Sequence, residues 1–248
     1  MGLFLISPER IEANRAVLDE GESRHLLKVL RKRPGDVIEL SDGRGHYFEG
    51  RIVQGRDTAQ VEILKAVDSP TSPPPHLILC QALLKNPRMD WLVEKAAELQ
   101  VQALFPFSSE RSVVKVPPGR DGDRKIARWQ KIAAAALKQS RQSLLPQIGP
   151  MFTWSGLLHR FEKTLAWKLL LLAERPDLPS LKTLRKSALP PQEFPLWIVL
   201  VGPEGGLTTK EISAAERSGF TACSLGPVTL RAETAALSAV SVLNYLKL

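Results

Sequence analysis

Two parts of the chain differ in the pattern of their hydrophobic positions. Up to about residue 70, short runs of alternating apolar and polar residues are separated by glycine turns, a pattern typical of antiparallel strands. These predicted strands cover residues 37–40, 47–52 and 60–63. A helix is predicted before them, at about residues 21–31, because its apolar residues form a single stripe. The spacing predicts a small β-barrel with one helix.

After residue 76 the pattern changes to apolar strands that alternate with amphipathic helices. The predicted strands cover residues 77–82, 103–107, 169–172, 196–201 and 222–225, and the predicted helices cover residues 89–99, 126–140, 209–218 and 232–246. The run Leu196–Val201 is apolar at every position, as in strands that are covered on both faces. This order predicts an α/β domain with a mostly parallel sheet and helices on both faces.

A proline-rich segment separates the two parts. Residues 68–75 read Asp-Ser-Pro-Thr-Ser-Pro-Pro-Pro, and such prolines disfavour helix, lack ladder donors and favour a stiff extended chain. We therefore expect an N-terminal domain at residues 1–70, a linker at residues 71–76 and a C-terminal domain at residues 77–248. A second proline-rich stretch, residues 176–195, is expected to be a long connection.

Composition excludes several classes of protein. The chain has 248 residues, of which 44% are hydrophobic and 24% charged, so a folded core is expected rather than disorder. The apolar residues 1–6 are too few for a signal peptide or a membrane span, and a cytoplasmic protein is expected. Cys80 and Cys223 lie in apolar runs, which favours two buried thiols. The four histidines have no partners at metal-ligand spacing, so no metal site is expected.

Positive charge is concentrated in the C-terminal part. The formal net charge is +8; residues 1–70 carry 11 basic and 12 acidic residues, and the remaining positions carry 23 and 14. Residues 111–141 alone contain nine basic and two acidic residues, including Arg111 and Lys138. A solvated helix face explains part of this bias, and phosphate contacts with a nucleic acid explain its sign better.

Basic residues also stand beside other predicted elements. Lys85 and Arg88 follow the first strand of the C-terminal part, at the carboxyl edge where α/β sheets bind ligands. In the N-terminal part, Arg24, Lys28 and Arg31 are spaced to share one helical face. That face is either a surface stripe or an RNA contact.

A glycine-rich turn after a strand is the first candidate for chemistry. Residues 202–206 read Gly-Pro-Glu-Gly-Gly and follow the strand that ends at Val201. Thr208 and Glu211 have the spacing of a capping box for the next helix. Glycine allows a ligand to approach the backbone closely at the carboxyl end of a parallel strand. The turn is therefore a candidate for contacts with an adenosine moiety, or else an ordinary strand-to-helix turn.

The second candidate is the polar start of the last helix, residues 226–236. Arg231, Glu233 and Thr234 adjoin an otherwise apolar helix, where they can serve as caps and an ion pair or can face a reacting base. The sequence contains no Gly-x-x-x-x-Gly-Lys motif, which argues against a P-loop NTPase. No Gly-x-Gly-x-x-Gly motif opens the first strand-helix unit, which argues against an ordinary Rossmann methyltransferase.

Taken together and in order, these segments resemble the uracil-N3 methyltransferases of 16S ribosomal RNA, which belong to the SPOUT class. The resemblance spans nearly the whole chain and is carried by residues 25–36, 88–99, 110–114, 202–206 and 225–235. It implies a SPOUT-type α/β domain with a trefoil knot, together with a small PUA-like β-barrel at the N-terminus that aids RNA binding.

The same resemblance implies S-adenosylmethionine as cofactor, 16S rRNA of the small ribosomal subunit as partner, and a homodimer. The cofactor pocket is expected to involve Leu172, Leu200, Gly202, Glu204, Gly205, Leu225, Gly226, Leu230 and Thr234. RNA is expected to contact Arg24, His25, Lys28, Arg31, Lys85, Arg88, Arg111 and Lys138. We expect Arg231 to stabilise negative charge on the base, because a guanidinium stays charged, and Glu233 to act as base or to organise Arg231.

Three other functions stay open on the residues alone. The first is a non-catalytic RNA-binding or ribosome-assembly module, which cofactor binding would distinguish. The second is a methyltransferase acting on a ribose 2′-hydroxyl or on another base, which mapping of the modified atom would distinguish. The third is an enzyme of small nucleotides, whose activity would be insensitive to salt.

Overall fold

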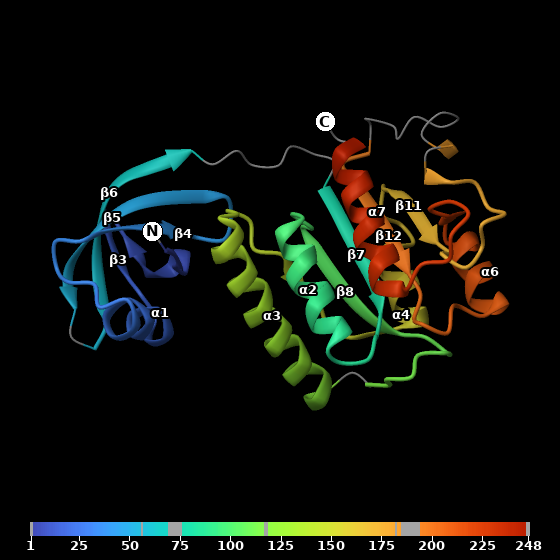
Figure 1. Ribbon diagram of the computed structural model, residues 1–248, viewed down its shortest axis with the longest axis horizontal. Helices are drawn as coiled ribbons and strands as arrows, with labels where there is room; N and C mark the ends of the chain where they lie inside the picture. The colour runs from blue at the N-terminus through green and yellow to red at the C-terminus, as the bar shows by residue number, and fades with distance from the viewer. Residues whose placement is uncertain are drawn as a thin grey trace. The chain divides into compact units, whose positions relative to one another are not determined.

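The computed structural model describes residues 2–55, 57–68, 76–116, 119–181, 183–184 and 194–246. Within it the chain forms two compact units (Figure 1). The N-terminal unit holds residues 1–71 and 134–145, and the C-terminal unit holds residues 72–133 and 146–248. Of the expected linker at residues 71–76, all but His76 lies outside the described residues, as do residue 182 and residues 185–193 of the expected long connection.

A curled six-stranded sheet forms most of the N-terminal unit. Its strands are β1 (Leu3–Leu5), β2 (Ile11–Glu12), β3 (Arg15–Val17), β4 (Val37–Ser41), β5 (His46–Gly55) and β6 (Ala59–Asp68). They pair in the order β1-β4-β5-β6-β3-β2, antiparallel except for β1 with β4. Phe4, Ile38 and Leu40 are among the buried residues of its core. Since no pairing among the described residues joins β1 to β2, the expected barrel is a half-barrel.

The helix of this unit is shorter than its sequence pattern predicts. Helix α1 (Glu20–Arg24) continues into a π-helical turn (His25–Val29), whereas the prediction covers residues 21–31. The helix ends early because Arg31 has a left-handed backbone, with a φ of 54°. Arg31 therefore lies beyond the helix rather than on one helical face with Lys28.

One segment expected in the C-terminal domain packs in the N-terminal unit instead. The Nζ atom of Lys138 lies 2.6 Å from Oε1 of Glu22. The amide of Gly45 donates to the carbonyl of Ser143 at 3.0 Å, and the amide of Leu145 donates to a carbonyl of the same strand connection at 2.8 Å. These bonds explain why residues 134–145 belong to the N-terminal unit although helix α3 (Arg120–Ser140) is continuous.

A seven-stranded sheet forms the centre of the C-terminal unit. Its strands are β7 (His76–Ala82), β8 (Ala103–Ser108), β9 (Gln147–Ile148), β10 (Phe152–Thr153), β11 (Trp167–Leu171), β12 (Leu196–Val201) and β13 (Thr221–Cys223). Six of them follow the order β10-β8-β7-β12-β11-β13, and β9 pairs with β8. Every pairing is parallel, which confirms the predicted parallel sheet.

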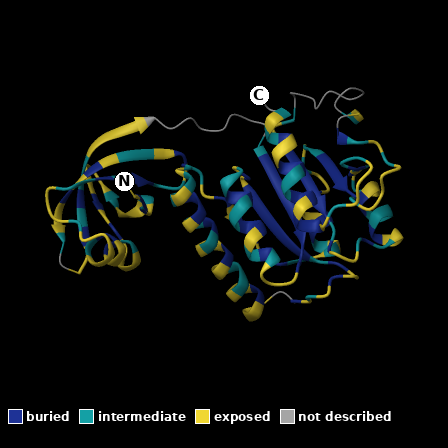
Figure 2. Cartoon of the chain, viewed as in Figure 1, coloured by how far each residue is buried: buried dark blue, intermediate teal, exposed yellow. Residues whose placement is uncertain are grey.

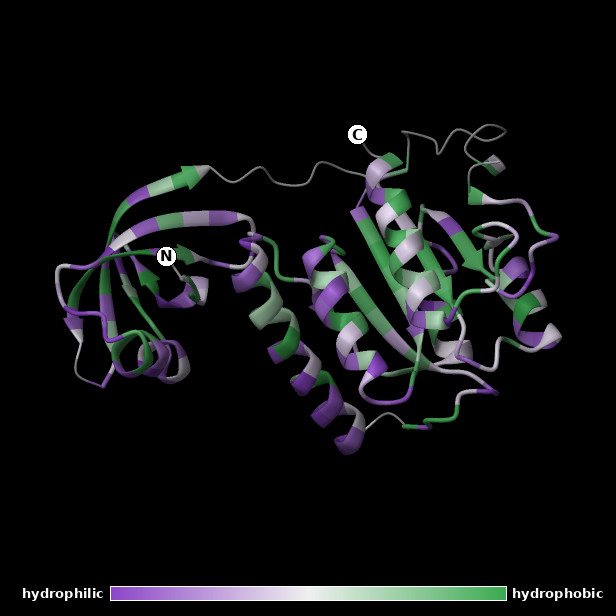
Figure 3. Ribbon diagram, viewed as in Figure 1, coloured by the Kyte–Doolittle hydropathy of each residue, from purple (hydrophilic) through white to green (hydrophobic). Residues whose placement is uncertain are grey.

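Helices cover both faces of this sheet (Figure 1). On one face, α4 (Trp154–Phe161) and α6 (Thr209–Arg217) join a core that includes Ile78 and Cys80. Side chains alternate between the faces of a strand, so the buried Leu77 and Leu79 point the other way, toward α2 (Arg88–Glu98) and α7 (Ala232–Leu246). Figures 2 and 3 show the result, strands that are buried and hydrophobic along their length.

The two cysteines are buried free thiols, as the sequence predicts. Burial raises the pKa of the Cys80 thiol, and it raises the pKa of Cys223 to about 12. Both thiols therefore stay protonated and unreactive at neutral pH.

Asp90 joins helices α2 and α3 through a buried indole. Its Oδ1 atom accepts a hydrogen bond from Nε1 of Trp129 at 3.0 Å, and Trp129 is 2% exposed. Its carboxylate also pairs with Arg128, at 2.5 Å and 3.3 Å, on the surface. We expect Asp90→Ala to lower the free energy of unfolding by about 1 to 3 kcal/mol, because the buried indole N–H loses its acceptor. Denaturant unfolding measures this loss.

Asp90→Asn is the matched control. The amide oxygen can still accept from Trp129, and only the exposed ion pair with Arg128 is lost, which is worth less than about 1 kcal/mol. Equal losses in the two variants would show that the indole bond contributes nothing.

Candidate active site

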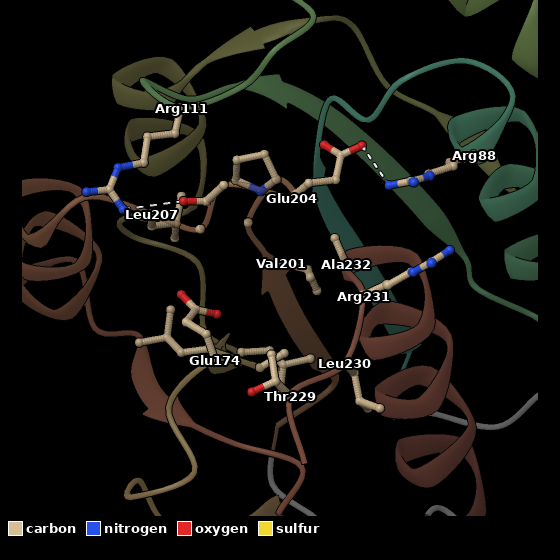
Figure 4. A pocket seen from close by; sticks show the side chains of 17 residues that line it. Arg88, Arg111, Glu174, Val201, Glu204, Leu207, Thr229, Leu230, Arg231 and Ala232 are labelled. Atoms are coloured by element: carbon tan, nitrogen blue, oxygen red, sulfur yellow. Dashed lines mark hydrogen bonds and ion pairs between the residues drawn. The ribbon is translucent and has the colours of Figure 1, made fainter. Parts of the chain in front are cut away.

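A cavity of about 450 Å³ opens at the carboxyl edge of the parallel sheet. Its wall consists of the residues after β11, the turn after β12, the segment before α7, and two arginines from α2 and from the loop after β8. The lining residues are Arg88, Arg111, Leu171, Leu172, Ala173, Glu174, Val201, Gly202, Pro203, Glu204, Gly205, Gly206, Leu207, Thr229, Leu230, Arg231 and Ala232. Figure 4 shows this cavity from close by.

The glycine-rich turn after β12 has the local geometry that its sequence predicts. The amide of Gly206 donates to the carbonyl of Pro203 at 2.9 Å, and Gly206 has a φ of +68°, which side-chain-bearing residues rarely adopt. Thr208 and Glu211 then form the predicted capping box at the start of α6. The turn between β12 and α6 therefore places the backbone of residues 202–206 along the cavity wall.

Arg88 links the turn to the last helix. Its Nη1 atom lies 3.3 Å from Oε1 of Glu204, and its Nε atom lies 3.6 Å from Oε1 of Glu233. The amide of Lys85 also donates to Oε1 of Glu204, at 3.3 Å. Glu204 and Glu233 thus hold the start of α2 against both loops of the cavity.

Arg231 presents its side chain to the cavity from the residue before α7. Its carbonyl accepts from the amide of Ala235 at 2.8 Å, which fixes its backbone at the start of the helix. Its side chain is exposed, and it forms no hydrogen bond or ion pair with another described residue. In Figure 4, Arg231 and Arg88 lie on the right of the view, and Arg111 and Glu174 lie on the left. The Arg231 guanidinium is therefore available to a ligand in the cavity.

Comparison with known proteins identifies the family of this chain. Residues 71–244 match the family described as "RNA methyltransferase domain", and residues 18–64 match "RNA methyltransferase PUA domain". The chain belongs to this RNA methyltransferase family. Its N-terminal half-barrel is accordingly a PUA domain, and the parallel sheet with its cavity lies in the RNA methyltransferase domain.

Individual relatives match nearly the whole chain. "Ribosomal RNA small subunit methyltransferase E" of Synechocystis sp. is 31% identical over 247 residues, which cover 98% of this chain and 77% of the relative. The protein of the same name from Aquifex aeolicus is 30% identical over 242 residues, 95% of this chain and 96% of the relative. A crystal structure of this methyltransferase from Neisseria gonorrhoeae, bound to S-adenosylmethionine, has a TM-score of 0.85 and 31% identity, and covers 99% of this chain and 98% of its own.

The structure brings together about half of the residues expected at the cofactor in this RNA methyltransferase. Leu172, Gly202, Glu204, Gly205 and Leu230 line the cavity. Leu200, Leu225, Gly226 and Thr234 are not among the lining residues. Leu200 lies fully buried in the core, because its side chain points to the face of the sheet that α4 and α6 cover.

Glu233 has a different neighbour from the expected one. It is 7% exposed, it pairs with Arg88 rather than with Arg231, and it does not line the cavity. Its Oε2 atom is buried and has no hydrogen-bond partner among the described residues. In this structure Glu233 is paired with Arg88, and its expected role as base or organiser of Arg231 stays a prediction.

Of the expected RNA-binding residues, Arg88 and Arg111 line the cavity and Lys85 adjoins it through its bond to Glu204. The others belong to the N-terminal unit, namely Arg24, His25, Lys28, Arg31 and Lys138. Arg24 and Lys28 line a separate hollow of about 460 Å³ in that unit. Lys138 is held by Glu22.

Nine lining residues were not among the predicted site residues, namely Leu171, Ala173, Glu174, Val201, Pro203, Gly206, Leu207, Thr229 and Ala232. Glu174 was within reach of prediction, because it follows the end of β11 at the same carboxyl edge. Among the described residues, no three His, Cys, Asp or Glu side chains gather as a metal site. No described helix is long and apolar enough to span a membrane.

Proposed function

We propose that the protein transfers a methyl group from S-adenosylmethionine to N3 of a uracil in 16S rRNA of the small ribosomal subunit. The observation that carries this proposal is the Arg231 guanidinium, which has no partner among the described residues and lines a cavity with the glycine-rich turn at the carboxyl edge of the sheet. Near full-length similarity to relatives named for the small-subunit RNA supports the substrate. We further propose that the protein works in the cytoplasm as a homodimer and without a metal.

The cavity suits S-adenosylmethionine in size and chemistry. Its volume of about 450 Å³ lies within the range of about 300 to 1,000 Å³ typical of small-molecule sites. The cofactor carries a carboxylate, a cationic sulfur and an adenine, and the wall offers arginines, the Glu174 carboxylate, leucines and the backbone of the turn. A Cβ atom on Gly206 would lie 2.9 Å from Oε1 of Glu174, so a side chain there would enter the same space.

The chemical step follows from positioning and charge. When bound, S-adenosylmethionine supplies a methyl group on a positively charged sulfur, and the N3–C bond forms as the S–C bond breaks. Uracil N3 carries a weakly acidic proton, which passes to solvent before attack and leaves a negative charge shared with the neighbouring carbonyl oxygens. Arg231 donates hydrogen bonds to these oxygens and stabilises that charge. Alignment of the two reactants lowers the barrier further.

Other parts of the chain bring the RNA to the cavity. A uracil in a helix hides its N3 in a base pair, so the substrate is a single-stranded or flipped uracil. Arg111 at the cavity would hold a phosphate of the substrate, and Arg24 and Lys28 of the PUA domain would contact phosphates of the same RNA. Such contacts make RNA affinity fall as salt concentration rises.

The test is transfer of labelled methyl from S-adenosylmethionine to small ribosomal subunits and to naked 16S rRNA, followed by mass spectrometry of the nucleosides. We expect label in 3-methyluridine. Label in a 2′-O-methylated nucleoside or in another base would replace the proposed target atom. Absence of transfer together with absence of cofactor binding would favour a non-catalytic RNA-binding module.

A further inference from the structure

The carboxylate of Glu211 joins two parts of the molecule that are far apart in the sequence. Glu211 lies in the first turn of α6 and is 6% exposed. Its Oε2 atom accepts hydrogen bonds from the amide and the hydroxyl of Thr208, at 2.9 Å and 3.1 Å. Its Oε1 atom accepts from the amide of Glu110 at 2.8 Å. A capping box needs only the first oxygen, so the second bond requires another explanation.

The bond to Glu110 holds a compact turn in the loop after β8. Ser109 and Ser112 close this turn, since the amide of Ser112 donates to the carbonyl of Ser109 at 3.2 Å and their hydroxyls lie 2.9 Å apart. Both serines are buried, with 4% exposure each. Lys115 adds a bond from its Nζ atom to the carbonyl of Glu110 at 3.1 Å. The backbone of Glu110 is thus held on both sides, by Glu211 at its amide and by Lys115 at its carbonyl.

The residue next to Glu110 reaches the cavity. Arg111 donates from Nη1 to the carbonyl of Gly205 at 3.3 Å, as the dashed line in Figure 4 shows. A Cβ atom on Gly205 would lie 3.3 Å from the carbonyl oxygen of Arg111, so the two backbones pack closely. Glu211 therefore fixes the backbone from which Arg111 reaches across the glycine-rich turn.

We infer that Glu211 is a positioning residue, which holds Arg111 at the mouth of the cavity through the Glu110 amide so that Arg111 meets the RNA substrate. This inference rests on the proposed function and assigns RNA affinity to a buried residue that cannot touch RNA. The ordinary role of Glu211 in capping α6 persists beside it.

Glu211→Gln separates the two roles. The amide oxygen of glutamine is most stable where it accepts two hydrogen bonds, from the amide and the hydroxyl of Thr208. In this orientation the side-chain NH₂ points toward the N–H of Glu110. Two donors then face each other, and the Glu110 turn is released while the helix cap remains. Hydrogen exchange in peptides spanning Ser108–Lys115 should become about tenfold faster or more, the loss expected for a hydrogen bond to a charged acceptor.

Thr208→Ala is the matched control, because it removes the capping hydroxyl and leaves the bond from Glu110 to Glu211 in place. We expect this variant to lower the melting temperature, to keep slow exchange in Ser108–Lys115, and to keep the KM for small ribosomal subunits within about twofold, since its loss is confined to the helix cap.

A cycle with Arg111→Ala then decides the inference. We expect Glu211→Gln to raise the KM for small ribosomal subunits by most of the factor by which Arg111→Ala raises it, with kcat little changed. The double variant should have the same KM as Arg111→Ala alone. Additive losses in the double variant, or equal behaviour of Glu211→Gln and Thr208→Ala, would overturn it. Should the wild-type protein transfer no methyl group, the proposed function fails, and the exchange rates together with 16S rRNA binding still test the positioning role.

Discussion

Replacement of Arg231 by Ala is expected to reduce kcat for methyl transfer by about 100-fold to 1,000-fold, the usual cost of removing a donor that stabilises developing negative charge. Arg231 is exposed in the cavity and has no partner among the described residues, so its removal leaves no buried charge behind. Affinity for S-adenosylmethionine and the melting temperature should change little. Single-turnover methyl transfer and calorimetric titration of the cofactor measure the two effects separately.

Arg217→Ala is the control for the loss of one positive charge. Arg217 is an exposed arginine in the last turn of α6 and does not line the cavity. Its removal should leave kcat unchanged. Comparable turnover by the Arg231→Ala and wild-type proteins would remove Arg231 from the mechanism.

Gly206→Ala is expected to weaken S-adenosylmethionine binding by about tenfold or more, which is about 1.4 kcal/mol. Gly206 has a φ of +68°, where an L side chain costs about 1 to 2 kcal/mol, so the turn must distort to accept alanine. The new Cβ atom would also lie 2.9 Å from Oε1 of Glu174, on the cavity wall. Calorimetric titration of the cofactor measures the change.

Gly35→Ala carries a similar backbone strain away from the cavity. Gly35 has a φ of +97°, and a Cβ atom there would meet nothing within 4 Å. Both variants should lower the melting temperature, and only Gly206→Ala should lose cofactor affinity. Equal cofactor affinity in the two variants would mean that the turn after β12 does not hold the cofactor.

Periodicity predicted the long elements of this fold well, for a physical reason. The sheet of the C-terminal unit is covered on both faces, so strands such as β12 are apolar at every position, and the intervening helices carry clear stripes. Thr208 and Glu211 likewise predicted the start of α6, because a capping box depends only on residues three positions apart in the sequence. The strands β2, β9 and β10 have two residues each, too few for any period to appear.

Features that depend on tertiary contacts could not be predicted from the sequence. Glu233 of α7 pairs with Arg88 of the neighbouring helix α2, and nothing in the local sequence of either residue marks the other as its partner. The left-handed backbone of Arg31 is not marked by its residue type, because glycine is the residue that usually adopts this conformation. Helix α3 shows no composition break at residue 134, although its end packs in the other unit. The trefoil knot, which rests on family resemblance, stays a prediction.

The most direct test of the central claim uses the RNA of the cell itself. A methyl group on uracil N3 occupies the position that pairs with adenine, so reverse transcriptase stops beside it. Primer extension on 16S rRNA should show one such stop in cells with the gene, no stop in cells without it, and a stop restored by the wild-type protein but not by Arg231→Ala. A stop that persists without the gene, or that Arg231→Ala restores in full, would contradict the account.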